Sequence, residues 1–338
     1  MKDKLWKNTT VYLVAAALLV VSACVIFLRS KTNTADEGSF FAMGTYVFVT
    51  AYKNDCTAEV KSTVEKCESE ISHRIESSYI ARLNDKKALA LPDYLSDILD
   101  MSLELCEATD GKYTACILPL TSLWNFDADK KTIPEASALE EALVRMDECF
   151  LACNDGLWTG MGIDLGSVGK GAACDAAAEV FKKNGASGVI AVGGSLALVG
   201  DKNKKAWTVA VRDPFSDSAS SVFLTLSLGE CFVSTSGSYE KCFIENQKLY
   251  HHILDSKTGM PAESELVSVT VITDSGALSD ALSTAFFLVG KERSLTLAAQ
   301  YGAQVVFVYA DKTVIATEGL SGKITSQSGT EITYEAVG

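Results

Sequence analysis

The sequence predicts a single α+β domain that follows an N-terminal targeting segment. The chain has 338 residues, of which 48% are hydrophobic, so it is long and apolar enough to form a well-buried core. Segments with strand and helix patterns alternate irregularly, and several strand segments follow one another without an intervening helix. That order favours an α+β fold over a doubly wound parallel sheet. No internal repeat is evident.

The first 28 residues have the composition of a signal peptide or membrane anchor. Three lysines among the first seven residues precede an apolar run from Val11 to Leu28 that only Ser22 interrupts. Cys24 lies in a lipoprotein-processing box and would carry the lipid after cleavage. The apolar run is also about long enough to span a bilayer uncut, so both interpretations stay open. In either case we expect anchoring at the cell membrane and an extracytoplasmic domain, because the lysines lie on the N-terminal side.

Residues 29 to 39 are polar and are predicted to form a linker, which leaves a folded domain at 40–338. Segments rich in β-branched and aromatic residues predict strands at 40–52, 189–199, 207–211, 222–226, 249–254, 266–273, 305–309, 313–317 and 332–334. Apolar residues at helical spacing predict helices at 57–75, 94–109, 136–146, 171–184, 278–288 and 292–301. The first of these helices has Val60, Val64, Cys67 and Ile71 on one stripe. Residues 110–114 are expected to form a turn that enters a strand.

Charge and cysteine content exclude some classes of function. A formal net charge of −13 without a basic segment in the domain argues against nucleic acid as a partner. None of the ten cysteines forms a C-x-x-C pair, and Cys149 with Cys153 is a weak metal spacing without nearby histidines. We expect most of the cysteines to be free, buried thiols.

The segment from Leu249 to Pro261 contains two of the three histidines in the chain. It is predicted to be a short strand followed by a turn that Gly259 and Pro261 close. Because side chains alternate across a strand, Tyr250 and His252 are expected on one face and His251 on the other. A strand that ends in a polar turn is a common place for an imidazole at the mouth of a site.

Two further segments have the residue types of a phosphate or metal site. Between Gly162 and Gly171, glycines surround Lys170 just before a predicted helix, so backbone N–H groups and the helix N-terminus can face an anion. The spacing fits neither a Walker P-loop nor a Rossmann fingerprint. Asp280 and Thr284 lie one turn apart on one face of a predicted helix. A carboxylate with a hydroxyl suits a hard cation such as Mg²⁺, although a helix cap would also explain either residue alone.

In order and rough spacing, these segments resemble the ApbE family of FAD:protein FMN transferases over about residues 40 to 310. The segments that carry the resemblance are Ala42-Met-Gly-Thr45, Asp110-Gly-Lys-Tyr113, Leu123-Trp-Asn125, Gly162 to Gly171, Val233 to Glu240, Leu249 to Pro261 and Ser279 to Phe286. The resemblance implies a T-fold-like core of mixed or antiparallel sheet with packed helices. It implies FAD contacts at Met43, Lys112, Tyr113, Thr114, Asp164, Lys170 and Leu254, and Mg²⁺ ligands at the Ser167 carbonyl, Asp280 and Thr284.

The activity that the resemblance implies is Mg²⁺-dependent transfer of FMN from FAD to a threonine or serine hydroxyl of an acceptor protein, with release of AMP. His252 is the candidate for the base that activates the hydroxyl, and Asp255 and Tyr239 are weaker candidates. The chain departs from the family pattern at Thr114, Ser195 and Ser283. Two alternatives therefore stay open: an FAD pyrophosphatase that uses water at the same site, and a non-catalytic flavin-binding surface lipoprotein.

Overall fold

The structure of the chain is a computed structural model that describes residues 35–202, 204–218, 220–327 and 329–337. The predicted signal peptide or anchor at 1–28 lies outside these residues. Within the described residues, no helix combines the length and the apolar character needed to cross a membrane.

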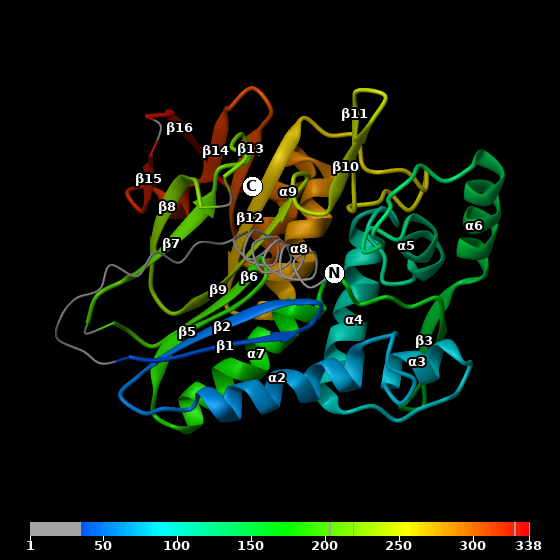
Figure 1. The fold of residues 1–338 in the computed structure, drawn as a ribbon, viewed down its shortest axis with the longest axis horizontal. Helices are drawn as coiled ribbons and strands as arrows, with labels where there is room; N and C mark the ends of the chain where they lie inside the picture. The colour runs from blue at the N-terminus through cyan, green and yellow to red at the C-terminus, as the bar shows by residue number, and fades with distance from the viewer. Residues whose placement is uncertain (1–34, 203, 219, 328, 338) are drawn as a thin grey trace, which may run out of the picture.

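A mixed sheet forms the centre of the described domain (Figure 1). In spatial order its strands are β1 (Asp36–Ala42), β2 (Thr45–Tyr52), β5 (Ser187–Val192), β6 (Ser195–Val199), β9 (Cys231–Gly237), β12 (Leu266–Thr273), β13 (Gln304–Tyr309), β14 (Val314–Thr317) and β16 (Ile332–Glu335). Neighbouring strands run antiparallel except for β14 and β16, which are parallel. The α+β prediction is therefore confirmed.

Several of the helices pack on one face of this sheet, and a smaller sheet covers the other. The helices are α2 (Thr57–Ile71), α3 (Tyr79–Asn84), α4 (Asp93–Ala108), α5 (Leu118–Trp124), α6 (Ala136–Glu148), α7 (Gly169–Lys183), α8 (Gly276–Val289) and α9 (Lys291–Tyr301). The smaller sheet consists of β15 (Ile324–Ser326), β8 (Val222–Leu228) and β7 (Trp207–Arg212). Alternation divides the central strands between two cores: Ile190 packs in the helical core, whereas its neighbour Val189 packs against the smaller sheet.

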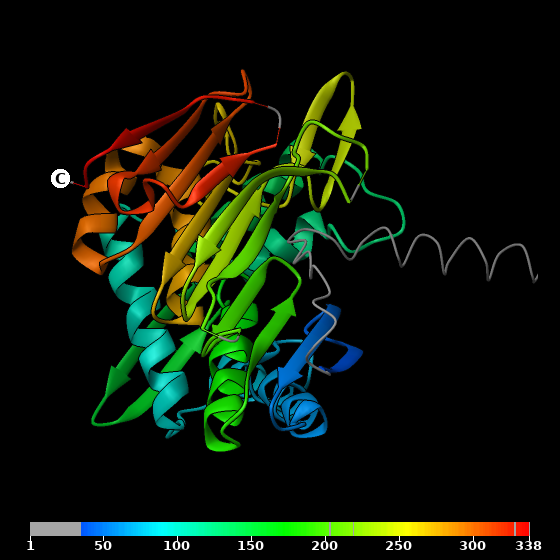
Figure 2. The same ribbon diagram turned by 90° about the vertical axis from the view of Figure 1, so that its left-hand side faces the viewer.

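Two hairpins complete the domain. They are β3 (Phe150–Asn154) with β4 (Leu157–Met161), and β10 (Cys242–Glu245) with β11 (Lys248–His251). Figure 2 shows the β10–β11 hairpin projecting from the body of the molecule. At its base, Phe243 and Tyr250 stack on each other, and Tyr250 also stacks on Trp124 at the end of α5. Phe243 lies tilted against Phe126.

Several sequence-based boundaries were wrong, two of them because a tight turn lies inside a continuous β-rich segment. The predicted strand at 40–52 is a hairpin, because Met43 and Gly44 turn the chain with φ of 56° and 67°. The predicted strand at 189–199 is likewise split, at Gly193. β1 begins at Asp36, so the last four residues of the predicted linker 29–39 belong to the sheet.

Other differences concern short elements near the candidate site. Residues 110–114 do not enter a strand; the chain continues into α5, which Pro119 helps to start. The predicted strand at 249–254 ends at His251, since the chain turns there to bridge Leu254 with Pro261. The sequence also missed α3, β3, β4, β9, β10 and β15. By contrast, the predicted stripe of α2 is buried as expected, at Val60, Val64, Cys67 and Ile71.

Helices α7 and α8 cross at two glycines. A Cβ atom on Gly171 would overlap the carbonyl oxygen of Gly276, and a Cβ atom on Gly276 would overlap that of Gly171. Backbone atoms cannot rotate away as a side chain can, so the helices would have to move apart.

We therefore expect Gly171→Ala to destabilise the fold by about 3 kcal/mol, the upper part of the usual cost of overpacking. Urea unfolding monitored by circular dichroism measures this change. Gly229→Ala is the matched control, because a Cβ atom at Gly229 has no described atom within 4 Å. Equal stability of the two variants would show that the helix crossing tolerates a methyl group.

Candidate active site

The candidate site forms around the N-terminus of α7, where the glycine-containing segment ends. Lys170, in the first turn, directs its Nζ to the Gly166 carbonyl at 3.3 Å and to Oδ1 of Asp280 at 3.2 Å. Burial by itself lowers the pKa of Lys170, but the charge of Asp280, its hydrogen bond to Lys170 and the charge of Glu240 together outweigh burial, so the pKa is raised. Lys170 is thus a charged ammonium at the positive end of a helix dipole, which is an arrangement suited to an anion.

Asp280 is the acidic centre of the site. Its residue is only 4% exposed, and its Oδ2 accepts hydrogen bonds from the Gly171 backbone N at 3.0 Å and from Lys170 Nζ at 3.3 Å. A buried carboxylate is costly unless it is paired, and here a cationic ammonium provides the pairing. The Asp280 carboxylate is therefore paired with the Lys170 ammonium at the position where the sequence predicts a metal ion.

Thr284 lies one turn further along α8, as its spacing predicts. Its hydroxyl lies 3.1 Å from the Ser236 hydroxyl, which also lies 2.8 Å from the Ser283 hydroxyl. Ser283 in turn donates to the Asp280 carbonyl at 2.9 Å. These hydroxyls and the Asp280 carboxylate are oxygen donors, which Mg²⁺ prefers. The residues present therefore fit a hard cation that shares phosphate oxygens.

Asp164 is held by residues that the sequence analysis did not single out. Its Oδ2 accepts from the Thr121 hydroxyl at 2.7 Å, and its Oδ1 accepts from the Gly166 backbone N at 2.8 Å. His73, the third histidine, places Nδ1 3.5 Å from Oδ1. Burial raises the pKa of Asp164, but His73 and the hydrogen bonds outweigh burial, so the net shift is downward. A carboxylate fixed in this way is available as an acceptor beside the α7 N-terminus.

Other predicted FAD contacts surround the same segment. The Tyr113 hydroxyl accepts a hydrogen bond from the Ser167 hydroxyl at 3.2 Å, and burial raises the pKa of Tyr113 to about 12. Met43, in the β1–β2 turn, lies close to the start of α7, since a Cβ atom on Gly169 would be 3.2 Å from the Met43 methyl carbon. Thr114 turns its hydroxyl towards its own backbone and accepts from the Cys116 N at 3.1 Å.

The remaining two predicted FAD contacts are Lys112 and Leu254. Lys112 is partly buried in the turn before Tyr113. Leu254 is only 3% exposed and belongs to the core formed by Trp124, Tyr250 and their neighbours. Its side chain is therefore a packing residue, and only its backbone remains for a ligand contact.

The two adjacent histidines have different environments. His251 is buried, with Nε2 3.1 Å from the Ala262 carbonyl oxygen and its ring edge-on to Phe287. His252 follows the strand and pairs its backbone N with the Lys241 carbonyl oxygen at 3.0 Å. Its Nδ1 is enclosed, and no hydrogen-bond partner for that atom occurs among the described residues. An enclosed nitrogen without a partner is unusual in a folded protein, and it distinguishes His252 from His251.

Burial first, and then the charges of Lys241 and Lys170, lower the pKa of His252 to about 3. The imidazole is therefore neutral at pH 7 and can accept a proton. The arrangement combines an ammonium, a buried carboxylate, several hydroxyls and a neutral imidazole, which together can bind a phosphate ester and move a proton.

A family model for the ApbE family matches residues 43–307 of the chain. The chain belongs to the ApbE family. Among its curated relatives, the FAD:protein FMN transferase of Treponema pallidum is 28% identical over 314 residues, which cover 83% of this chain and 86% of that protein. The enzyme of the same description from Haemophilus influenzae is 26% identical over 315 residues, covering 87% and 90% of the two chains.

Solved structures agree with this assignment. The ApbE protein of Thermotoga maritima has a TM-score of 0.75 and 27% identity, and the match covers 85% of this chain and 98% of that chain. The flavin transferase ApbE of Vibrio cholerae has the same TM-score of 0.75 at 22% identity, over 86% and 99% of the two chains, which shows the shared fold. The resemblance seen in the sequence is thereby confirmed.

The departure at Ser195 from the ApbE pattern has a structural explanation. Ser195 is buried and accepts a hydrogen bond from the Ser234 hydroxyl at 3.1 Å, and Ser234 lies 2.9 Å from the Ser279 hydroxyl. A row of hydroxyls thus joins β6, β9 and α8 behind Asp280. Every member has a partner, so the substitution leaves no buried polar group unpaired at this position.

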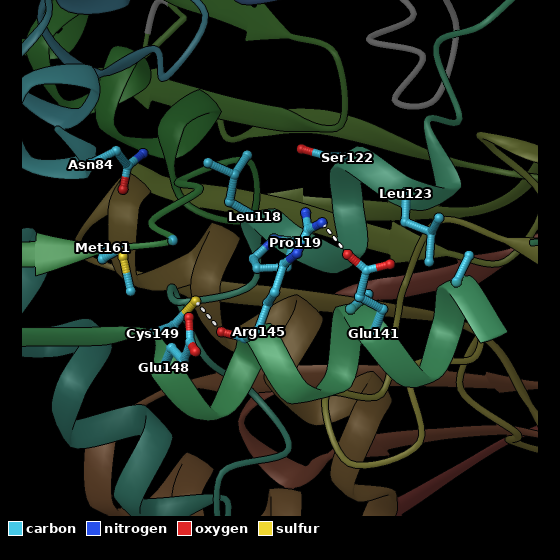
Figure 3. Close-up of a pocket in the computed structure, with 13 residues that line it drawn as sticks. Asn84, Leu118, Pro119, Ser122, Leu123, Glu141, Arg145, Glu148, Cys149 and Met161 are labelled. Atoms are coloured by element: carbon cyan, nitrogen blue, oxygen red, sulfur yellow. Dashed lines mark hydrogen bonds and ion pairs between the residues drawn. The ribbon is translucent and has the colours of Figure 1, made fainter.

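A separate pocket of about 540 Å³ lies between α5 and α6 (Figure 3). Leu118, Pro119 and Leu123 line it from α5, and Arg145 and Glu141 line it from α6, where they pair with each other. None of the predicted site residues lines this pocket. The predicted site residues therefore lie outside this pocket, and Thr121 of α5 bonds to Asp164 instead.

Proposed function

We propose that this ApbE-family chain transfers FMN from FAD to a threonine or serine hydroxyl of an acceptor protein and releases AMP. The observation that carries the proposal is the ion pair between Lys170, at the N-terminus of α7, and Asp280 on α8, the helix that also carries Thr284. The neutral imidazole of His252 supports it. Both the relatives described above and the solved structures have names that refer to flavin transfer or to ApbE.

The chain's own groups would bind and orient the phosphates. Lys170 and the α7 N-terminus attract the anionic pyrophosphate, while the partly buried Met43 provides contact surface for the flavin. Asp280, Thr284 and the Ser167 carbonyl would hold Mg²⁺, with Ser236 keeping the Thr284 hydroxyl in place. Bound Mg²⁺ neutralises phosphate charge and favours in-line displacement at phosphorus.

His252 would accept the proton of the acceptor hydroxyl as the new phosphoester bond forms. Its neutral state leaves a nitrogen lone pair for this purpose, and the residue as a whole is only partly buried. The hydroxyl oxygen attacks the FMN phosphorus, the bond to AMP breaks, and the acceptor becomes an FMN phosphoester. Water in place of the hydroxyl would give an FAD pyrophosphatase with the same residues.

Incubation of the purified protein with FAD, Mg²⁺ and a candidate acceptor protein tests this function. Flavin fluorescence that stays with the acceptor after denaturing gel electrophoresis is the expected result. Release of AMP and free FMN without labelled acceptor would favour the pyrophosphatase, and FAD recovered intact would leave a flavin-binding protein. Omission of Mg²⁺ and replacement of the acceptor hydroxyl are the two controls.

We further propose that residues 1 to 28 hold the protein at the cell membrane with the domain outside the cytoplasm. If Cys24 is lipidated, Cys24→Ser should release the protein from membranes, because acyl chains then provide the attachment. If the apolar segment spans the bilayer uncut, the same variant should stay membrane-bound. The intact mass of the wild-type protein decides between them: a chain that starts at Cys24 with added lipid mass supports processing, and retention of residues 1 to 23 contradicts it.

A further inference from the structure

Helices α7 and α8 carry the same short pattern, a glycine followed four residues later by an aspartate. In α7 these residues are Gly171 and Asp175, and in α8 they are Gly276 and Asp280. Residues four apart lie on the same face of a helix, so each helix presents its glycine and aspartate to the other. The close approach of the two glycines places each aspartate next to the partner helix's N-terminus.

Each aspartate caps the opposite helix. Asp280 accepts from the Gly171 backbone N at 3.0 Å, and Asp175 accepts from the Gly276 backbone N at 2.6 Å. Neither donor has an intrahelical acceptor, since both lie in the first turn of their helix. We call the set of Gly171, Asp175, Gly276 and Asp280 the reciprocal clasp.

Asp175 provides the larger part of the cap on α8. In addition to Gly276, it accepts from the Ala277 backbone N at 2.7 Å and from the Ser275 hydroxyl at 3.3 Å. The next free amide of α8, that of Leu278, reaches the Ser275 hydroxyl at 3.4 Å. The first turn of α8 is therefore fully hydrogen-bonded, and a negative charge lies at the positive end of its dipole.

The clasp fixes the side chain on which the proposed metal site depends. Asp280 lies one turn inside α8, so the position of that turn against α7 sets the distance from the Asp280 carboxylate to Lys170 and to the Ser167 segment. We infer that Asp175 is a positioning residue for flavin transfer: by capping α8 it holds the Asp280 carboxylate in the geometry that binds Mg²⁺. This inference rests on the proposed Mg²⁺ site. Asp175 itself contacts neither Lys170 nor Thr284 by any hydrogen bond among the described residues.

Asp175→Asn is the informative variant, because it keeps the volume of the side chain but removes its charge and one acceptor oxygen. We expect the Mg²⁺ concentration for half-maximal transfer to rise by about tenfold to a hundredfold, the usual cost of disturbing a residue that orients a metal ligand. At saturating Mg²⁺, kcat should return to within about threefold of wild type. Titration with Mg²⁺ alone, followed by the rise in Tm, gives a readout that does not depend on turnover.

Ser294→Ala is the matched control. The Ser294 hydroxyl donates to the Gly290 carbonyl at 2.6 Å and to the Phe286 carbonyl at 3.2 Å. The substitution therefore loosens the other end of α8 and leaves the reciprocal clasp unchanged. The control should lower Tm but leave the Mg²⁺ requirement unchanged. If Asp175→Asn is too unstable to purify, Asp175→Glu keeps the charge and displaces the carboxylate by one methylene, with the same expected change in Mg²⁺ requirement.

The three possible results of these experiments lead to different conclusions about Asp175. A raised Mg²⁺ requirement in the Asp175 variant but not in Ser294→Ala supports the inference. An unchanged requirement, with activity falling only as the folded fraction falls, overturns it and leaves the proposed function intact. A wild-type protein whose Tm and turnover do not respond to Mg²⁺ overturns the proposed metal assignment, and the role of Asp175 with it.

Discussion

Asp280→Ala is expected to reduce flavin transfer by roughly a thousandfold, because bound metal contributes several kcal/mol to stabilising charge at phosphorus. Asp280 is the single carboxylate among the proposed metal ligands, and it also caps α7 through Gly171. Its removal leaves Lys170 without its counter-ion in a largely buried place. The expected loss therefore combines weaker metal binding with a displaced cation.

Steady-state kinetics across a range of Mg²⁺ concentrations measure this effect, with circular dichroism to show that the variant is folded. Asp274→Ala is the matched control, since Asp274 is an exposed aspartate just before α8. Thr284→Val should cause a milder loss, of about tenfold, because a hydroxyl contributes less charge to a hard cation than a carboxylate does. Full Mg²⁺-stimulated activity in a folded Asp280→Ala protein would rule out the metal assignment.

His252→Ala is expected to lower kcat by at least about a hundredfold, which is the usual contribution of a general base. FAD binding should persist, because Lys170 and the α7 N-terminus remain. His251→Ala should affect kcat much less but should destabilise the fold, since it removes the ring packed on Phe287 and the contact with the Ala262 carbonyl. Comparable losses of kcat in the two folded variants would contradict the assignment of His252 as the base.

The pH dependence of stability provides a second test of His252. Its folded-state pKa of about 3 lies below the ordinary value of 6.5. The folded state therefore binds fewer protons than the unfolded state between these values, and the free energy of unfolding falls as pH drops below about 6.5. Burial also lowers the pKa of His251, so this residue too makes the free energy of unfolding fall as pH drops. Urea unfolding between pH 7 and pH 4 should show a smaller decline in His252→Ala than in wild type.

A bound anion should change the kinetic pH profile. Lys241 and Lys170 help to lower the pKa of His252 in the free protein, and the negative pyrophosphate of FAD would oppose their effect. The acidic limb of the pH profile of kcat should therefore lie at higher pH than the acidic limb for kcat/KM, because kcat reports the enzyme–substrate complex. Coincident limbs would show that His252 does not sense the substrate charge.

The prediction of the fold succeeded where the signals are local. The apolar stripe of α2, the glycines before α7 and the strand at β12 follow from residue spacing within a few turns or one strand. The α+β class and the ApbE family could likewise be read from the order of segments. Boundaries failed at Met43 and Gly193, because a single turn inside a β-rich segment leaves the strand propensity on both sides unchanged.

For the candidate site, the sequence identified the residue types and the tertiary structure decided their partners. Lys170, Asp280, Thr284 and His252 could be named from motifs, since each lies in a segment with its own pattern. The contacts of His73 and Thr121 with Asp164 could not, because neither residue lies in such a pattern. The clasp between Asp175 and Gly276 joins residues 101 positions apart, and only the packing of α7 on α8 brings that carboxylate to the first turn of the helix that carries Asp280.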